Sequence, residues 1–279
     1  MALGINVGIV GLGLMGGSMG YALKNIDSVS KVLGYDHDHT HEEASLKLNT
    51  IDEIASFNEI LKCDVIILAI PVNAIVQLFE KLEYVSSDTV IIDLGSTKES
   101  IVKSIPASIR KNFVAAHPMT GTEKFGPYAA VQKLYDDKVI VLCDIEESGQ
   151  KQKDIAIKLF KEIKMNIVYM DSSEHDLHAA FISHLPHAIS FALANTVLSQ
   201  EDPKSILNLA AGGFKDMSRL AKSSPHMWEA IFDENRTNVL ESIELFEREL
   251  LTFKEHLKNR DYTSLHYNIK QAASLHDIL

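Results

Sequence analysis

Two short stretches of the chain combine residue types that can transfer a proton and bind an anion. Residues 117–123 have the sequence His-Pro-Met-Thr-Gly-Thr-Glu, and residues 95–98 have the sequence Gly-Ser-Thr-Lys. An imidazole, with a reference pKa of about 6.5, is suited to accept a proton near neutral pH. Spacing alone leaves a second interpretation open, in which His117 is a helix cap or a hydrogen-bonded core residue.

A glycine-rich stretch, Gly11-Leu-Gly-Leu-Met-Gly16, follows an apolar run and opens a helical pattern. Gly11 permits a tight turn, Gly13 leaves room for a pyrophosphate, and Gly16 lets the helix lie close to the strand. The helix N-terminus adds free N–H groups and the positive end of a dipole. This pattern predicts a dinucleotide site, whose contacts we expect from Gly11, Gly13, Leu14, Met15, Gly16, Asp36, Ile70, Pro71 and Ser96.

Asp36 ends the second apolar run, twenty residues after Gly16. A carboxylate at this place accepts hydrogen bonds from the ribose hydroxyls, and its charge repels a 2′-phosphate. No Lys or Arg lies between Asp36 and Glu43, so NAD is predicted rather than NADP. The alternative is a glycine turn that serves only packing, with Asp36 a surface residue.

The elements that must position these loops alternate along the first part of the chain. Short runs rich in Val and Ile are separated by helical patterns, for example at 15–24, 74–83 and 150–164, which predicts an α/β fold with a doubly wound, Rossmann-type parallel sheet. Both polar loops then leave the carboxyl edge of the sheet, where ligands bind in such folds. The predicted strands are 6–10, 32–35, 64–70, 90–93, 113–116, 138–142 and 166–169.

After about residue 170 the strand patterns stop and only helical patterns follow. Residues 174–198 predict one long apolar helix with a kink at Pro186. We therefore expect an NAD-binding domain at 1–170 and an all-helical substrate and dimerisation domain at 171–279. The further predicted helices are 204–211, 214–221, 227–232, 235–257 and 262–276.

Composition excludes several classes of function. Of 279 residues, 46% are hydrophobic and 23% charged, as in globular proteins, and the net charge of −11 disfavours binding to nucleic acid. Cys63 and Cys143 lie in or beside apolar runs, so we expect both to be small core residues and not part of a disulfide framework. Free cysteines fit a reducing, cytoplasmic setting. The N-terminus shows no signal-peptide pattern, and we expect no apolar run as long as a membrane span.

Four motifs in one order resemble the prephenate and arogenate dehydrogenases. They are Gly-Ser-Thr-Lys at 95–98, His-Pro-Met-Thr-Gly-Thr-Glu at 117–123, Ser-His-Leu-Pro-His at 183–187, and Gly-Gly-Phe-Lys-Asp-Met-Ser-Arg at 212–219. Trp228 fits the same pattern, and the resemblance extends from Gly11 to about residue 235. Ala211 departs from it, because the family often has a third glycine there. With no mutase or regulatory domain in the pattern, we expect a monofunctional enzyme.

The resemblance implies oxidative decarboxylation of a cyclohexadiene dicarboxylate, with hydride passing to NAD and carbon dioxide leaving the opposite ring carbon. It implies that His117 is the general base, that Ser96 orients it or shares the hydroxyl contact, and that Glu123 gates or orders the site. It also implies a homodimer joined through the helical domain. The substrate-binding residues that it implies are Arg219, His187, Thr122 and Lys215, with Lys98 and Lys124 adding positive potential.

Several alternatives stay open at this point. Prephenate and arogenate differ only in a keto or amino group, and no residue is assigned to that choice. A β-hydroxyacid dehydrogenase would begin with a similar glycine turn, and a sensor would bind NAD without turnover. The spacing of His175, His178, His184 and His187 also invites a zinc site, but the carboxylate spacing of a metalloprotease helix is absent, so we predict no metal.

Overall fold

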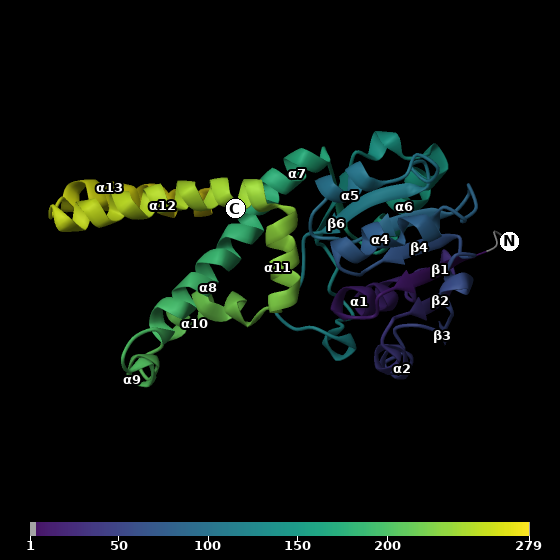
Figure 1. The fold of residues 1–279 in the computed structure, drawn as a ribbon, viewed down its shortest axis with the longest axis horizontal. Helices are drawn as coiled ribbons and strands as arrows, with labels where there is room; N and C mark the ends of the chain where they lie inside the picture. The colour runs from purple at the N-terminus through teal and green to yellow at the C-terminus, as the bar shows by residue number, and fades with distance from the viewer. Residues whose placement is uncertain (1–3, 279) are drawn as a thin grey trace. The chain divides into compact units, whose positions relative to one another are not determined.

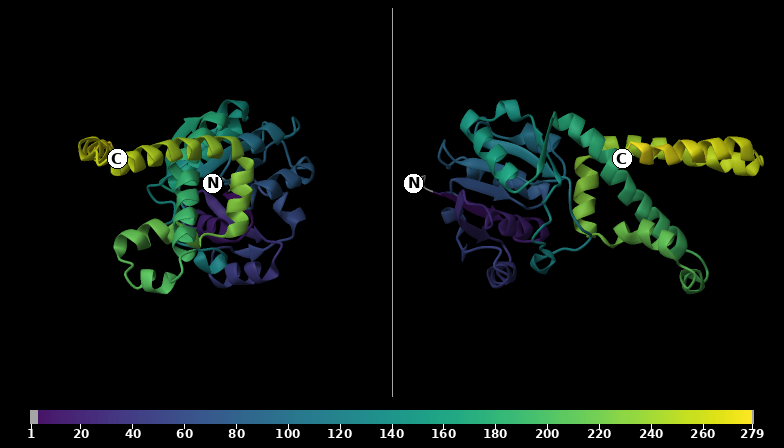
Figure 2. Two further views of the ribbon diagram at one scale, coloured as in Figure 1. Left: turned by 60° about the vertical axis from the view of Figure 1, so that its left-hand side comes forward. Right: turned by 180° about the vertical axis from the view of Figure 1, so that it is seen from behind.

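The computed structural model describes residues 4–278, so the first residues of the stretch assessed for a signal peptide lie outside the described residues. The chain divides into two compact units, of which one ends at Asn235 and the other begins at Arg236 (Figures 1 and 2). The predicted domain boundary between residues 170 and 171 is a different division and stays a prediction. The second unit consists of α12 (Arg236–Lys258), α13 (Tyr262–Ala273) and the short η5 (Ser274–Asp277).

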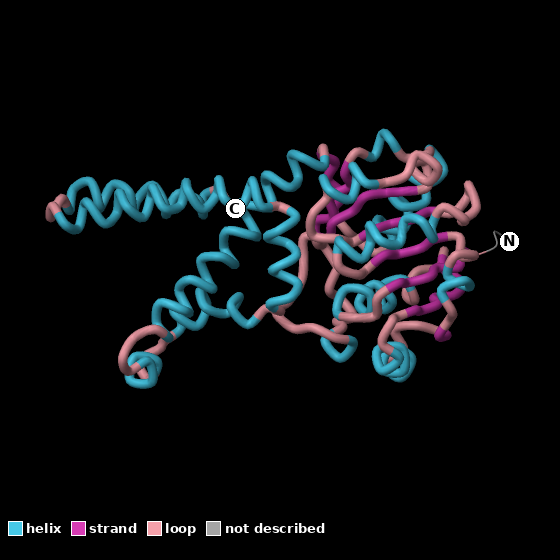
Figure 3. The backbone as a smooth tube through the Cα atoms, viewed as in Figure 1, coloured by secondary structure: helices cyan, strands magenta, loops and turns pink. Residues whose placement is uncertain are grey.

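An eight-stranded sheet, with the order β3-β2-β1-β4-β5-β6-β7-β8, forms the centre of the first unit (Figure 3). All neighbouring strands are parallel except β6 and β7, which confirms the predicted Rossmann-type fold. The strands are β1 (Ile5–Val10), β2 (Val29–Tyr35), β3 (Glu53–Ile54), β4 (Val65–Leu68), β5 (Val90–Asp93), β6 (Phe113–Pro118), β7 (Val139–Cys143) and β8 (Asn166–Met170).

Two features of this sheet differ from the sequence expectation. Strand β3 has only two residues, both exposed, so it has no buried apolar run to reveal it. Strand β7 is antiparallel to β6 because the connection between them contains only the short 3₁₀ helix η1 (Pro127–Ala129). The connection, residues 119–138, contains no α-helix of the kind that usually carries a parallel crossover.

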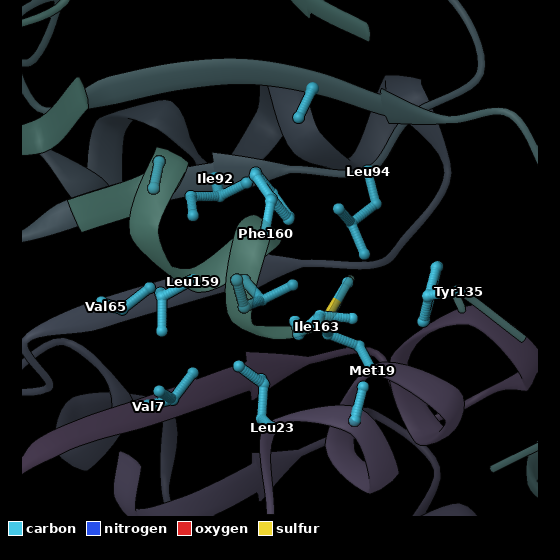
Figure 4. Packing of buried hydrophobic residues seen from close by; sticks show 14 of the residues in the cluster. Val7, Met19, Leu23, Val65, Ile92, Leu94, Tyr135, Leu159, Phe160 and Ile163 are labelled. Carbon is cyan, nitrogen blue, oxygen red and sulfur yellow. The ribbon is translucent and has the colours of Figure 1, made fainter. Parts of the chain in front are cut away.

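Helices cover both faces of the sheet. On one face, Met19 and Leu23 of α1 and Leu159 and Phe160 of α6 pack on the sheet (Figure 4). On the other face, α4 supplies an apolar stripe that includes Phe79. The helices of this part are α1 (Leu14–Leu23), α2 (His39–Lys47), α3 (Phe57–Ile60), α4 (Val72–Leu82), α5 (Glu99–Ser104), η2 (Ile145–Glu147) and α6 (Gln150–Glu162).

After β8 the first unit continues only as helices, as the sequence predicted. Ala211 lies just before the short helix that carries Gly212 and Gly213, so the departure from the glycine pattern leaves this helix in place. The helices are α7 (Ser172–Ala179), η3 (Ala180–His184), α8 (Leu185–Leu198), α9 (Pro203–Leu207), α10 (Gly212–Ser218), η4 (Arg219–Lys222) and α11 (Pro225–Glu234).

The long apolar helix contains a π-helical segment, η3, directly before Pro186. A π segment and a proline each disturb the regular hydrogen-bond ladder of an α-helix, and both lie where the sequence predicted a kink. By length and composition, Ser172–Leu198 is also long and apolar enough to cross a membrane, with 27 residues and a mean hydropathy of 1.2. This corrects the expectation that no apolar run reaches that length. One such helix is weak support for membrane insertion, because core helices of soluble proteins pass the same test.

Candidate active site

A cavity of about 440 Å³ lies at the carboxyl edge of the sheet and is lined by residues from four separate stretches. Leu14 and Met15 come from the start of α1, and Ser96 follows β5. Strand β6 and the loop after it supply residues 117–125, and the helical stretch supplies the rest of the wall. The predicted residues that line it together are Ser96, His117, Thr122, Glu123, His187 and Arg219.

Lys215 is the predicted substrate-binding residue that does not line this cavity. It lies exposed on α10, and its predicted role stays a prediction. Lys124 does line the cavity and is exposed, so it can add positive potential there.

Lys98, in contrast, lies beneath the site and not on its surface. Its ammonium group is fully buried, is paired with the carboxylate of Asp93, and donates to the carbonyl oxygen of Ala116 at 2.9 Å. The carboxylate of Asp93 offsets the positive charge of Lys98, so the potential that Lys98 was expected to add stays a prediction. The ion pair ties the loop after β5 to the residue that precedes His117 in β6.

His117 lies near the end of β6 and is half-buried. Its Nδ1 is 2.8 Å from Nε2 of His175, and Nδ1 of His175 is 2.8 Å from Oδ1 of Asp176. Burial, together with the nearby His175 and Lys98, holds the pKa of His117 well below its ordinary value of 6.5. His117 is therefore a neutral imidazole at neutral pH, the state that a general base requires.

The contact of His117 with His175 was not predicted, because Ser96 was the residue expected to orient His117 or to share the hydroxyl contact. His175 is separated from His117 by 58 positions and was considered only as a possible metal ligand. Its burial, 2% exposed beside the buried Asp176, could not be read from the local sequence.

Arg219 and Glu123 face each other inside the cavity, with Nη1 and Oε2 3.3 Å apart. A hydrogen bond from the backbone N–H of Glu123 lowers the pKa of its carboxyl group, and Arg219 lowers it further. The guanidinium of Arg219 remains about half exposed, with a side-chain exposure of 54%. It can therefore contact an anionic ligand without leaving the pocket.

Aromatic rings also line the cavity. His187 stacks on Trp228, with ring centroids 3.6 Å apart, and His184 meets the same indole edge-on at 5.8 Å. Burial lowers the pKa of His187 and lowers that of His184 to about 4, so both rings are neutral at neutral pH. Asn235 lies 3.1 Å from Nδ1 of His184. The stacked pair of His187 and Trp228 is uncharged and offers a ring of a ligand an aromatic surface.

The glycine turn has the geometry of a pyrophosphate site. Gly11 has a φ of +91°, and a Cβ there would lie 2.5 Å from the carbonyl oxygen of Ala69. A Cβ on Gly16 would lie 1.8 Å from the carbonyl oxygen of Gly11, whereas one on Gly13 would meet nothing within 4 Å. The space beside Gly13 and the N-terminus of α1 therefore fit the diphosphate of a dinucleotide.

Asp36 is buried beside this turn. Its Oδ2 accepts the backbone N–H of Leu12 at 2.7 Å, and its Oδ1 accepts that of Asp38 at 3.0 Å. Ile70 packs against Gly11, and the exposed Pro71 precedes α4. These positions agree with an adenosine ribose bound next to Asp36, and they fit the predicted cofactor.

The zinc alternative receives no support from the positions of the histidines. Within residues 4–278 no three His, Cys, Asp or Glu side chains are grouped so that they could hold a metal ion. His184 is instead engaged with Asn235, and His187 with the carbonyl oxygen of Ser183. The prediction that the site needs no metal stays a prediction.

The chain is similar to known proteins over nearly its whole length. Residues 19–169 match the family model "Prephenate dehydrogenase, nucleotide-binding domain", and residues 171–271 match "Prephenate dehydrogenase, dimerization domain". A prephenate dehydrogenase of Bacillus subtilis is 30% identical over 96% of this chain and 74% of its own length.

The chain is also similar over nearly its whole length to solved structures of dehydrogenases. The prephenate dehydrogenase of Aquifex aeolicus in complex with hydroxyphenyl propionate and NAD⁺ has a TM-score of 0.90 and 33% identity, covering 98% of this chain and 97% of that one. The arogenate dehydrogenase of Synechocystis has a TM-score of 0.81 and 25% identity, covering 98% of this chain and 99% of that one.

Proposed function

Since this chain belongs to the prephenate dehydrogenase family and is an NAD-dependent oxidoreductase, we propose that it converts prephenate to 4-hydroxyphenylpyruvate, carbon dioxide and NADH in tyrosine biosynthesis. One observation carries this proposal. His117 and Arg219, from the sheet and from the helical stretch, line one cavity together with Leu14 and Met15 of the glycine turn. A base, an anion-binding cation and the cofactor site therefore meet in one place.

His117 acts as the general base on the ring hydroxyl. Its Nδ1 is engaged with His175, which leaves Nε2 as the nitrogen that can reach a ligand in the cavity. Ser96 lines the same cavity and shares the contact with the hydroxyl. A positioned base of this kind contributes roughly 10²–10⁴-fold to a rate.

Arg219 holds a carboxylate of the substrate. A guanidinium binds a carboxylate through paired hydrogen bonds, and that of Arg219 is half exposed within the cavity. When no substrate is present, the carboxylate of Glu123 pairs with the guanidinium of Arg219 and so orders the site. Thr122 offers a hydroxyl on the same loop, and His187 with Trp228 packs against the ring.

The glycine turn, Asp36 and Ile70 hold the dinucleotide as described above. When bound, NAD supplies the acceptor for the hydride that leaves the hydroxyl-bearing ring carbon. The protein's part is to hold the dianionic substrate in line with that acceptor and to accept the hydroxyl proton.

Measuring NADH formation with prephenate, with arogenate and with small β-hydroxyacids in parallel tests this proposal. We expect turnover with prephenate, and its loss in a His117→Asn variant that still binds NAD. Turnover with arogenate alone would change the substrate to its amino analogue. Turnover of hydroxyacids alone, or NAD binding without turnover of any of the three, would reject the proposal.

We also propose that the protein is a cytoplasmic homodimer. Residues 171–271 match a family model described as a dimerization domain. Within the second unit, α12 leaves five large apolar side chains 40–56% exposed, and such a surface is typical of one that a partner covers. Both cysteines are buried free thiols, as in reducing compartments. A concentration-independent monomer in sedimentation would reject the dimer. The five side chains are Leu240, Leu250, Leu251, Phe253 and Leu257.

A further inference from the structure

Three side chains form a continuous chain of hydrogen bonds that leads away from the cavity. Nδ1 of His117 contacts Nε2 of His175 at 2.8 Å, and Nδ1 of His175 contacts Oδ1 of Asp176 at 2.8 Å. His117 lines the cavity, whereas His175 and Asp176 lie behind it, each about 2% exposed. Neither of them can touch a ligand, so any effect they have on the reaction acts through His117.

The chemistry of the groups fixes the direction of one of these hydrogen bonds. A carboxylate only accepts hydrogen bonds, so Nδ1 of His175 must carry a proton and donate it to Asp176. Nε2 of His175 and Nδ1 of His117 are 2.8 Å apart, so one of these nitrogens donates and the other accepts, and we take Nδ1–H of His117 as the donor. The remaining nitrogen of His117, Nε2, is then left without a proton.

We propose that His175 and Asp176 are positioning residues that hold His117 in the tautomer with a free lone pair on Nε2, directed at the substrate hydroxyl. The proposal rests on the function proposed above, because it gives His117 its role as a base. It adds two residues that no motif of the sequence assigned to the reaction.

Asp176 is itself rigidly placed. Oδ1 also accepts the backbone N–H of Lys98 at 2.8 Å, and Oδ2 accepts that of Glu99 at 2.9 Å. Its carbonyl oxygen accepts a hydrogen bond from the side-chain amide of Asn235 at 2.6 Å. The carboxylate therefore cannot rotate away from His175, and it connects the loop after β5 to the base on β6.

The tautomer matters because the base must take a proton and give it back. The hydroxyl proton passes to Nε2 of His117, and the electron pair of the O–H bond stays on the oxygen as a carbonyl forms. When the ring becomes aromatic that oxygen recovers the proton from Nε2. The reaction as proposed therefore releases no net proton, and His117 is neutral again after each turnover. With a proton already on Nε2, His117 could not accept the first one.

Nitrogen-15 NMR of histidine-labelled protein tests the tautomer without using activity. The His117 signals are identified by their absence in His117→Asn, and the ring nitrogen shifts distinguish a protonated nitrogen from a bare one. We expect a protonated Nδ1 and a bare Nε2 near neutral pH. A protonated Nε2 in the native protein would overturn the proposal, whatever the substrate proves to be.

Two variants of His175 separate its hydrogen bond from its bulk. In His175→Gln the amide oxygen can accept from His117 while the amide N–H faces Asp176, so we expect the His117 tautomer to persist. In His175→Leu the acceptor is lost, and we expect mixed tautomers and a kcat lower by roughly 10²-fold or more at similar KM. Equal kcat in the two variants, with NAD bound normally by both, would overturn the proposal.

Asp176→Asn and His178→Gln complete the set. The amide of Asn removes the negative charge beside His175 in either orientation, so we expect kcat to fall at least ~10-fold while NAD affinity is kept. His178 lies exposed one turn along α7, and its substitution should leave tautomer and kcat unchanged. A normal kcat in Asp176→Asn would remove Asp176 from the proposal. If His175→Leu fails to fold, the proposal is still tested by the His117 tautomer of the native protein and by that of His175→Gln.

Discussion

The guanidinium of Arg219 lies 3.3 Å from the carboxylate of Glu123, a residue 96 positions earlier in the chain. The two groups project into the same cavity from η4 and from the loop after β6. A dianionic substrate brings a carboxylate of its own, which can replace that of Glu123 on Arg219. The pair is thus an internal occupant of the site where we expect the substrate to bind.

Replacing Arg219 with Ala is expected to weaken substrate binding by ~2–5 kcal/mol, expressed chiefly in KM, because a carboxylate in the cavity loses its paired hydrogen bonds. Steady-state kinetics with prephenate at saturating NAD measures the effect. Lys222→Ala is the matched control, because this exposed cation lies on the same short helix but does not line the cavity. An unchanged KM in the Arg219 variant would make it an ordinary surface residue.

Replacing His117 with Ala is expected to lower kcat by ~10²–10⁴-fold while the affinity for NAD changes little, because the diphosphate and ribose are expected to be held by the glycine turn and Asp36 and not by the imidazole. Because burial holds its pKa well below 6.5, His117 is already neutral at neutral pH. For the native enzyme, kcat/KM should stay level as pH falls through neutrality and decline only below the ordinary histidine range. Near-normal turnover of the variant, or a decline centred near neutrality, would contradict this account.

Much of the fold could be predicted because its signals are local. The apolar runs that form β1, β4 and β5 are buried on both faces, and a strand of that kind is visible in the sequence itself. The direction of β7 could not be predicted, since an apolar run carries no information on which way it pairs. Strand β3 was missed because its two residues are exposed.

The site was predictable only in part, because some of its features depend on local sequence and others on contacts between distant segments. The three glycines of the turn lie within six consecutive residues, so the sequence pattern was sufficient to predict it, although part of the steric requirement at Gly11 comes from Ala69. The pairing of His117 with His175 depends on packing between elements 58 positions apart in sequence. Lys98 pairs with Asp93 only five positions away, but its burial depends on how the rest of the chain packs around it. The convergence of Arg219 on the cavity was expected from the family resemblance and not from spacing.

Gly13 and Gly16 should respond differently to the same substitution. A Cβ on Gly16 would lie 1.8 Å from a backbone oxygen, so Gly16→Ala should lower the melting temperature as well as NAD affinity. A Cβ on Gly13 meets no protein atom within 4 Å, so Gly13→Ala should keep the melting temperature but weaken NAD binding by at least ~10-fold, since it fills the phosphate space. Thermal unfolding and calorimetric titration measure both. Normal NAD binding by Gly13→Ala would mean that the pyrophosphate lies elsewhere.

The native enzyme should use NAD in strong preference to NADP. The carboxylate of Asp36 is buried beside the turn, where it would repel a 2′-phosphate, and no Lys or Arg follows before Glu43. Measuring kcat/KM for both cofactors checks this preference. In Asp36→Ser, NAD affinity should fall, and the ratio of kcat/KM for NAD to kcat/KM for NADP should become smaller. Comparable kcat/KM for NAD and NADP in the native enzyme would contradict the assignment.

The stability of the protein should fall as the solution becomes acidic, and His184 is expected to contribute to this fall. Its pKa is lowered by burial from 6.5 to about 4 in the folded state, whereas in the unfolded chain it returns to its ordinary value. Between these two values the unfolded state binds more protons than the folded one. The contribution of His184 to the free energy of unfolding is therefore fully present above about pH 6.5 and is lost as pH falls toward about 4.

The contribution of His184 is at most about 3.5 kcal/mol, because its pKa falls from 6.5 to about 4 and one pKa unit corresponds to about 1.4 kcal/mol. Urea unfolding at a series of pH values measures it. In His184→Asn the amide oxygen can still accept from Asn235 but does not titrate, so stability should depend less steeply on pH. The buried His117 continues to titrate, which leaves a smaller dependence. His178→Asn, at an exposed position, should keep the native slope, and an equally steep slope in His184→Asn would show that the buried imidazole is not linked to unfolding.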